Sequence, residues 1–599
     1  MKDPAKIEDY AFLSDTQTGA LVSRDGCVDW LCLPRFDSPA CFASLLGKKE
    51  NGHWLFTPKE KVDKVSRRYR GDTLILETEI ETAGGAVRLI DFMPPRGKNP
   101  DLVRIVEGLR GEVRMEMELI IRFEYGSIIP WVRKAHEGLE AIAGPDGLIL
   151  RTPIETRGED LTTVAEFTVK KGERLPFVLT WFASHEEPAR AINPEHALRD
   201  TEKFWNAWAQ QCHYSGPWKD AVKRSLITLK GLTYAPTGGL VAALTTSLPE
   251  GIGGVRNWDY RYCWLRDATF TLITLMRVGY RDEAKSWREW LLRAIAGSGA
   301  QMQIMYGVHG ERWLYEREIP WLSGYGNSRP VRVGNAASNQ FQLDVFGEVL
   351  LAMHQSHVAG LQTDESDWRL QVQLMRFLES NWDQPDEGIW EVRGGRKHFT
   401  HSKMMAWVAF DRAVKLAQLC KCAAADNVER WKKIRDQIHA EVCERGYNID
   451  KKAFTQFYGS DALDASLLMM PRVGFLPPSD ERVRGTIEAV ERELVRDGLV
   501  LRYRTEEENV DGLPGGEGTF LACSFWLANS LHLIGRTEEA KALFERLLTL
   551  RNDLGLISEE YDPIGKRQLG NFPQAFTHLA MVNTARILSG DEKFPTGET

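Results

Sequence analysis

Three clusters in the C-terminal two thirds of the chain combine aromatic rings with charged groups. Asn257–Ala268 holds four aromatic residues, two arginines and two aspartates within twelve residues. Trp390-Glu391 and Glu559-Glu560 lie in two other segments. Aromatic rings cover the apolar face of a sugar, while arginine and carboxylate groups hydrogen-bond to its hydroxyls. The combination indicates a carbohydrate site, although an aromatic core segment beside a solvated ion pair also fits the first cluster alone.

Glu391 and Glu559 are the candidate catalytic pair. Hydrolysis of a glycosidic bond needs one carboxyl group that protonates the leaving oxygen and one carboxylate that activates water or attacks carbon. A partly apolar wall beside Trp390 would raise the pKa of Glu391 and keep its proton, which leaves Glu559 as the base. A single glutamate is normally a solvated surface residue, so the hypothesis depends on the placement of both.

The chain that supports these clusters shows two successive sequence patterns. The first, in the N-terminal third, predicts mainly β-strands. Val113–Phe123 alternates apolar and polar residues except at Ile120, which predicts a half-buried antiparallel strand. Thr73–Met93 predicts a hairpin that turns at Ala83-Gly84-Gly85. Short strands continue to about residue 182, so the sequence predicts an N-terminal antiparallel β-sandwich.

The second pattern is helical and begins near residue 217. Apolar periodicity predicts twelve helices, at about 218–235, 264–279, 281–298, 337–360, 364–381, 401–421, 426–447, 460–470, 479–496, 520–535, 537–550 and 573–589. Links after odd-numbered helices are long, and links after even-numbered helices are short. This alternation predicts six helical hairpins closed into an (α/α)6 barrel, with the long links and therefore the site at one end. An open helical array is the alternative, but no fixed repeat is visible.

These patterns predict a multidomain protein of α and β structure. The expected parts are a β-sandwich domain at 1–193, a linker helix within 194–216, and an (α/α)6-barrel catalytic domain at 217–599.

The amino-acid composition argues against several kinds of binding partner. The net charge is −8 and no basic stripe is present, so no nucleic-acid partner is expected. No apolar run reaches the ~20 residues that span a bilayer, so no membrane partner is expected either. An odd number of cysteines, nine, and the lack of a secretion signal predict reduced thiols and a cytoplasmic location. No His/Cys cluster has zinc spacing, and neither a metal nor a cofactor is expected. The sequence does not indicate an oligomeric state.

Longer motifs carry a resemblance that covers nearly the whole chain. The chain resembles glycoside hydrolase family 15, which includes glucoamylases, glucodextranases and bacterial trehalases. The N-terminal motifs are Ile7–Tyr10, Leu21–Gly26 and Trp30–Ser38. The motifs of the helical part are Thr245–Glu250, Asn257–Ala268, Pro330–Asn335 and Asp511–Phe520.

The resemblance implies roles for individual residues. Glu391 matches the general acid of the family, and Glu559 matches its general base. Arg266 and Asp267 match the pair that holds the far hydroxyls of the terminal glucose, and the aromatic residues Tyr260 and Trp264 match the lining of that subsite. Trp390 and Glu560 are expected to contact substrate, and Glu560 stands where many glucoamylases have glutamine. The family inverts the anomeric carbon, which implies carboxyl groups about 6.5–9.5 Å apart.

The resemblance also has limits. Fungal members have aspartate two residues before the tryptophan of the acid motif, whereas this chain has Gly388. Transfer of the acceptor side from fungal enzymes is therefore unsafe. The N-terminal motifs are most similar to the trehalase-type branch, which makes α,α-trehalose the leading substrate. Glucoamylase or isomalto-oligosaccharide glucohydrolase activity is the alternative. More distant alternatives are a disaccharide phosphorylase and a non-catalytic glucan-binding protein.

Overall fold

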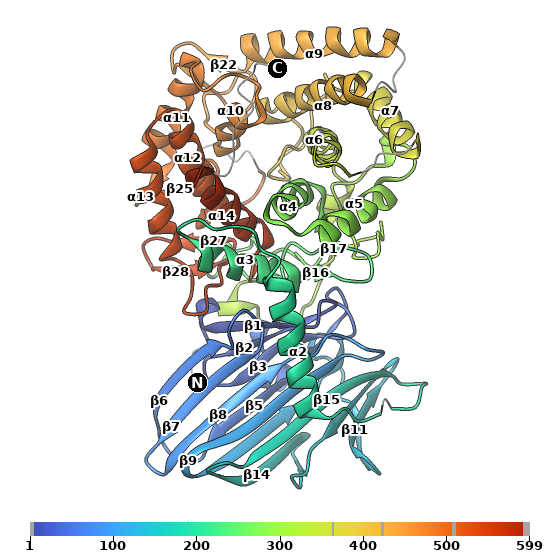
Figure 1. The fold of residues 1–599 in the computed structure, drawn as a ribbon, viewed down its shortest axis with the longest axis vertical. Coiled ribbons are helices and arrows are strands. Elements are labelled where there is room, and N and C mark those ends of the chain that lie inside the picture. The colour runs from blue at the N-terminus through green and yellow to red at the C-terminus, as the bar shows by residue number, and fades with distance from the viewer. Residues whose placement is uncertain (1–4, 189, 362–364, 421–424, 506–510, 591–599) are drawn as a thin grey trace.

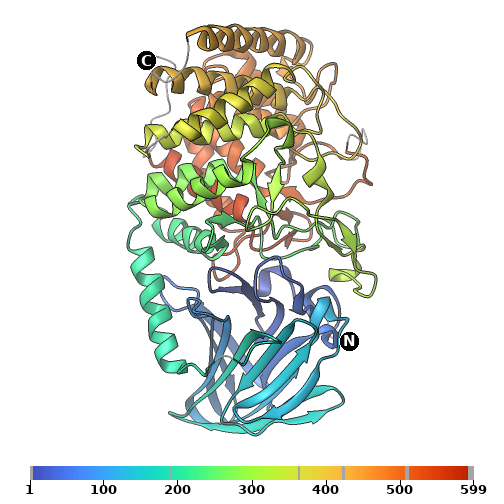
Figure 2. The same cartoon turned by 90° about the vertical axis from the view of Figure 1, so that its right-hand side faces the viewer.

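The computed structural model describes residues 5–188, 190–361, 365–420, 425–505 and 511–590. A β-rich part is formed by the first third of the chain and a helical part by the rest (Figures 1 and 2). One large apolar core runs through both parts without a break.

The β-rich part is a single antiparallel sheet of 15 strands. The strands are β1 Tyr10–Ser14, β2 Gly19–Ser23, β3 Cys27–Cys32, β4 Ala40–Phe42, β5 His53–Pro58, β6 Val62–Tyr69, β7 Leu76–Thr82, β8 Gly85–Phe92, β9 Asp101–Ile120, β10 Trp131–Ala135, β11 Gly138–Ala143, β12 Asp146–Arg151, β13 Arg157–Glu159, β14 Thr162–Lys170 and β15 Arg174–Ala183. The predicted hairpin is β7–β8, which turns at Ala83-Gly84.

Strand β9 joins the two halves of this sheet. Its first half pairs with β8 and β15, and its second half pairs with β5 and β14. Phe177 on β15 packs against Phe56 on β5 with ring centroids 4.7 Å apart, and against Phe167 on β14. Side chains from the two halves therefore meet in one core. The predicted alternation holds from Val113 to Leu119, where every second side chain is buried.

The helical part begins after α2, the predicted linker helix, which runs between the two parts in Figure 1. The α-helices after the sheet are α2 Pro194–Ala209, α3 Lys219–Gly231, α4 Leu265–Val278, α5 Arg281–Ile295, α6 Asp344–Val358, α7 Glu365–Glu379, α8 Thr400–Cys420, α9 Ala425–Arg445, α10 Met470–Val473, α11 Glu481–Leu494, α12 Leu521–Leu533, α13 Thr537–Leu548 and α14 Ala575–Leu588. Eleven of the twelve predicted helices are present as regular α-helices.

The predicted helix at 460–470 is wrong. The chain forms a 3₁₀ helix, η7, at Ala465–Met469, followed by the single turn α10. The Asp464 side chain accepts from the Ser466 N–H, so the helical turn begins only at Ala465. Pro471 lacks the N–H that would join η7 to the next turn, and Gly474 ends α10 with a φ of 77°. Two short elements therefore replace one longer helix.

Six elements contact one another in a ring. Contacts lead from α4 to α6, α8, η7, α12 and α14, and α14 returns to α4. The remaining long helices pack outside this ring, as α5 does on α4, α9 on α8 and α13 on α12. The links that enter α4, α6, α8, η7, α12 and α14 are the long ones, as predicted.

Two further expectations concern the whole chain. Among the described residues, no helix combines the length and apolarity needed to cross a membrane. Of the eight cysteines that the structure describes, seven carry free thiols, whereas Cys420 at the end of α8 is disulfide-bonded, so the prediction of reduced thiols fails at that position.

Candidate active site

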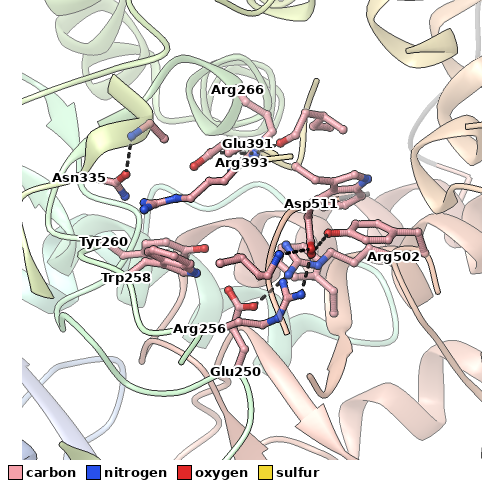
Figure 3. Close-up of a pocket in the computed structure, with 16 residues that line it drawn as sticks. Glu250, Arg256, Trp258, Tyr260, Arg266, Asn335, Glu391, Arg393, Arg502 and Asp511 are labelled. Carbon is pink, nitrogen blue, oxygen red and sulfur yellow. Dashed lines mark hydrogen bonds and ion pairs between the residues drawn. The ribbon is translucent and has the colours of Figure 1, made fainter. Parts of the chain in front are cut away.

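A cavity opens where the long links meet, and Figure 3 shows the side chains that surround it. The lining comes from the links before α4, α6, α8 and α12 and from the first turn of α4. The lining residues are Glu250, Arg256, Trp258, Tyr260, Arg266, Asn335, Ala337, Ile389, Trp390, Glu391, Arg393, Arg502, Tyr503, Asp511, Leu513 and Phe520. The predicted convergence of distant segments at one end is therefore present.

The predicted site residues fall into two groups. Tyr260, Arg266, Trp390 and Glu391 line the cavity. The others, Trp264, Asp267, Glu559 and Glu560, are buried and contact the cavity only through neighbouring side chains. The lining residues Glu250, Trp258, Asn335 and Asp511 belong to motifs of the resemblance but had no assigned role. Their position in long links with several Gly and Pro residues was the available signal.

The charged residues of the segment Asn257–Ala268 have two different roles: some hold the segment in place, and one faces the cavity. In the extended stretch before α4, Trp258 and Tyr260 face the cavity. Arg261 is fully buried, pairs with Asp259 at 2.7 Å and bonds to Tyr125 of the β-rich part. The Asp259–Arg261 pair thus fastens the segment to the sheet, and Arg266 is the arginine of the segment that the cavity exposes.

Glu391 lies on the side of the cavity formed by α4 and the link before α8. The Trp264 indole N–H donates to its Oε1 at 2.7 Å, and Arg266 Nη1 lies 3.7 Å from the same oxygen. Arg266 is held in turn by Asp267 at 3.1 Å and by the carbonyl of Ile389 at 2.9 Å. Burial raises the pKa of Glu391, while Arg266 and the Trp264 N–H oppose this effect. The direction is the one predicted for a proton donor.

A tight turn fixes the backbone of Glu391. Gly388 has a φ of 68°, and a Cβ there would lie 2.7 Å from the ring of Phe399. The Glu391 N–H donates to the carbonyl of Gly388, and Glu391 itself has a φ of 58°, which is uncommon outside glycine. The glycine that departs from the fungal pattern is thus required by this turn.

Glu559 lies close to Tyr260, in the link before α14. It is 1% exposed and accepts a long hydrogen bond, 3.3 Å, from the Asn571 N–H. Burial and the nearby Glu250 carboxylate raise its pKa to about 8, although the Tyr260 hydroxyl and Arg502 oppose this. A general base must be ionised, so a pKa near the usual value for glutamate was expected for Glu559. The pKa is raised instead, because Glu559 is buried and other carboxyl groups surround it.

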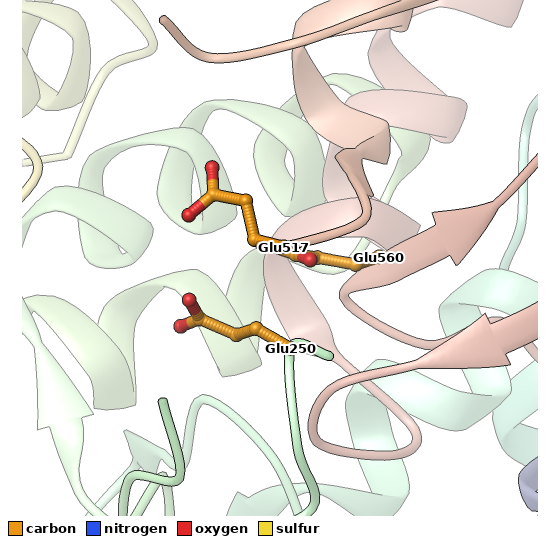
Figure 4. A group of neighbouring side chains, drawn as sticks. All are labelled: Glu250, Glu517 and Glu560. Atoms are coloured by element: carbon orange, nitrogen blue, oxygen red, sulfur yellow. The ribbon is translucent and has the colours of Figure 1, made fainter. Parts of the chain in front are cut away.

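Those carboxyl groups form an acidic cluster, defined here as Glu250, Glu517, Glu559 and Glu560. Oxygens of Glu250, Glu517 and Glu560 lie within 4.8 Å of one another (Figure 4). This spacing is compatible with a metal ion, but Arg502 already donates to Glu250 at 2.9 Å and to Glu517 at 2.6 Å. Glu560 is fully buried and neither of its carboxyl oxygens has a hydrogen-bond partner. Burial and Glu250 raise its pKa well above the usual value.

Tyr260 connects the two sides. Its ring packs edge-on against Trp264, 5.2 Å between centroids, and Trp264 bonds to Glu391. Burial and the carboxylates of Glu559, Glu250 and Glu391 all raise the pKa of Tyr260. In Figure 3, Glu391 and Arg266 lie above the rings of Tyr260 and Trp258, and Glu250 lies below them. Carboxyl groups thus approach one aromatic surface from two sides.

The aromatic and charged lining of this cavity fits a glycoside hydrolase, and similarity to known proteins shows that the chain is one. Residues 216–586 match the model of Glycosyl hydrolases family 15, and residues 2–205 match that of Trehalase-like, N-terminal. The trehalase of Mycobacterium tuberculosis is 41% identical over 98% of this chain and 90% of its own length. The trehalase of Mycolicibacterium smegmatis is 40% identical over 98% and 92%. The chain therefore belongs to glycosyl hydrolase family 15.

A solved structure agrees with this assignment at the level of the fold. A bacterial glucoamylase in complex with acarbose superposes with a TM-score of 0.72, at 12% identity, over 98% of this chain and 94% of that one. The β-rich and helical parts are thus arranged in both proteins in the same way.

Proposed function

We propose that the chain is an inverting, exo-acting α-glucosidase that hydrolyses α,α-trehalose to two molecules of glucose. The observation that carries the mechanism is that Tyr260 adjoins both proposed catalytic groups: its ring packs against Trp264, which donates to Glu391, and the Glu559 carboxylate is close enough to raise the pKa of Tyr260. Full-length similarity to two trehalases, each aligned over 98% of this chain, supports the substrate.

In the proposed reaction, Glu391 gives its proton to the glycosidic oxygen as the bond to the anomeric carbon breaks. Glu559 takes a proton from the water that attacks this carbon from the opposite face. One glucose leaves with its original anomeric configuration and the other is inverted. Glu391 ends ionised and Glu559 ends protonated, and exchange with solvent restores both. We expect the two carboxyl groups to lie about 6.5–9.5 Å apart in the substrate complex.

The remaining site residues select the sugar. Arg266 is presented to the hydroxyls of the terminal glucose, and Asp267 orients its guanidinium group. Tyr260 and Trp258 offer aromatic surface, and Trp264 holds Glu391. Since the Trp390 indole N–H is bonded to Asp464, Trp390 offers the sugar only its ring.

The ring of contacts among α4, α6, α8, η7, α12 and α14 supports a closed (α/α)6 barrel as the architecture of the helical part. The contacts of Phe177 with Phe56 and Phe167 support a β-sandwich. We retain 1–193, 194–216 and 217–599 as the proposed divisions, with α2 as the linker.

The test is glucose release from trehalose, maltose, isomaltose and starch, each with and without phosphate. The proposal predicts that trehalose is the preferred substrate and that two glucose molecules form without any sugar phosphate. Preference for maltose, isomaltose or starch would favour the glucan-hydrolase alternative. A sugar phosphate that forms only with phosphate would indicate a phosphorylase, and no turnover of any sugar would indicate a binding protein.

A further inference from the structure

Asp464 lies outside the cavity lining, yet it contacts the residue that precedes the proposed acid. Asp464 is in the link before η7, far in sequence from Glu391, and is 2% exposed. The Trp390 indole N–H donates to both of its carboxyl oxygens, at 2.9 and 3.0 Å. One buried carboxylate therefore holds the side chain adjacent to Glu391.

Several hydrogen-bond donors surround the carboxyl group of Asp464 and oppose the rise in its pKa that burial causes. Besides Trp390, its donors are the Ser466 N–H at 2.8 Å, the Ser466 hydroxyl at 2.6 Å and the Gln456 amide at 3.2 Å. Each of these partners donates to the carboxylate. A carboxylate with several fixed donors is a strong acceptor, so it holds the indole firmly.

The Trp390 ring has little freedom on its other sides. It packs against Phe520, Trp526 and Tyr503, with ring centroids 5.4, 6.0 and 6.5 Å away. The hydrogen bonds to its nitrogen and the three neighbouring rings hold the Trp390 side chain in one position. This restrains the backbone that leads into Glu391.

This restraint matters because Glu391 has an unfavourable backbone conformation. Its φ of 58° lies in the left-handed region, where a residue other than glycine persists only if its surroundings enforce it. The enforcing contacts are the bond to Gly388, the Gln340 amide that donates to the Glu391 carbonyl at 3.0 Å, and the anchored Trp390. Without the anchor, the turn can relax and move the carboxyl group of Glu391.

We propose that Asp464 is a positioning residue that acts through Trp390 to hold Glu391 where it can protonate the leaving oxygen. The inference rests on the proposed function, in which Glu391 is the acid. It assigns Asp464 no contact with substrate.

The experiment compares two substrates that differ in their need for an acid. Trehalose has a sugar hydroxyl as leaving group, which must be protonated, whereas the fluoride of α-glucosyl fluoride departs without protonation. D464N removes an anionic acceptor and keeps an aspartate-sized side chain that can still cap η7. W390F removes the N–H from the other end of the same bond. D146N is the matched control, because Asp146 accepts from the Trp181 indole at 2.8 Å in the β-rich part.

The expected result is a selective loss. D464N and W390F should each lower kcat on trehalose by about tenfold to a hundredfold, the size expected for a small displacement of a catalytic group. D464N should keep a KM for trehalose close to that of the wild type. Its kcat on α-glucosyl fluoride should also be close to the wild-type value. The double variant should lose no more than the larger single loss, since both changes act on the same contact. D146N should resemble wild type on both substrates.

Two results would overturn the inference. If D464N hydrolyses trehalose with the same kcat as the wild type, Glu391 does not need Asp464 to hold it. If D464N loses kcat equally on both substrates, Asp464 has a general structural role. Thermal unfolding of each variant identifies a loss caused by misfolding, and W390F then serves as the second test. Failure of the proposed function is recognised separately, because E391Q would then hydrolyse trehalose normally.

Discussion

The two sides of the cavity hold their glutamates in different ways. Glu391 has 19% of its side chain exposed and meets one indole N–H and the guanidinium of Arg266. Glu559 is 1% exposed and belongs to a cluster with three other carboxyl groups, among which Arg502 provides positive charge. Burial raises the pKa at both positions, but the next largest influence is the opposing guanidinium of Arg266 at Glu391 and the reinforcing carboxylate of Glu250 at Glu559. The residue type is the same, and the neighbours decide the chemistry.

The largest expected effect tests whether both sides are needed. E391Q and E559Q should each lower kcat on trehalose by roughly 10² to 10⁴-fold, the usual contribution of general acid–base catalysis. Steady-state kinetics with purified variants measures this, and circular dichroism checks the fold. Near-normal activity of either variant would remove that glutamate from the mechanism.

The second prediction concerns the cation within the acidic cluster. R502M leaves Glu250 without its ion-pair partner and leaves Glu517 paired with Arg256 alone, and it should cost about 3–5 kcal/mol of stability. On the other side of the cavity, Arg393 pairs with Glu316 while 29% of its side chain is exposed, so R393M should cost about 1 kcal/mol or less. Urea unfolding of the two variants measures the difference. Equal costs would mean that the two sides do not differ in electrostatic stability.

The third prediction concerns pH. Glu559 must be ionised to act and its pKa is raised to about 8, so activity should fall as pH decreases below about 8. E250Q removes the neighbouring negative charge, which lowers the pKa of Glu559. The acidic limb of kcat/KM should therefore move to lower pH. An unmoved limb, or one displaced to higher pH, would show that Glu250 does not control the base.

The smallest effect is expected at Glu560. Its pKa is raised in the folded protein, so folding retains a proton that the unfolded chain releases above about pH 4.5, and stability is lost as pH rises above that value. Glutamine is neutral throughout, so E560Q should stabilise the protein more at pH 8 than at pH 5. Unfolding midpoints at the two pH values test this, and a gain that is larger at pH 5 would contradict it. Activity should change little.

Local patterns and the family resemblance together predicted most helices and strands and several of the residues that line the cavity. Apolar periodicity correctly predicted eleven helices and the alternation of long and short links, because both depend on residues close together in the sequence. The helix predicted at 460–470 failed because Asp464 caps a 3₁₀ helix that starts only at Ala465, and Pro471 prevents the two short elements from joining. Arg266, Tyr260 and Glu391 were predicted to lie at the site and do line the cavity.

The rest depends on contacts between distant segments. The local pattern alone does not separate Arg261, which pairs within the core, from Arg266, which lines the cavity; only the family resemblance singled out Arg266. The pairing of Trp390 with Asp464 joins two loops 74 positions apart. The raised pKa of Glu559 arises from Glu250, which reaches it from the link before α4. Such relations follow from the closure of the helical part and have no local signature.

The division of labour between the two sides is tested most directly by the hydrolysis of α-glucosyl fluoride by E391Q and E559Q. Fluoride needs no proton to leave, whereas attack by water still needs a base. The account predicts that E391Q retains most of its kcat on this substrate while E559Q loses activity on both the fluoride and trehalose. Loss of fluoride hydrolysis in E391Q together with its retention in E559Q would reverse the roles and contradict the account.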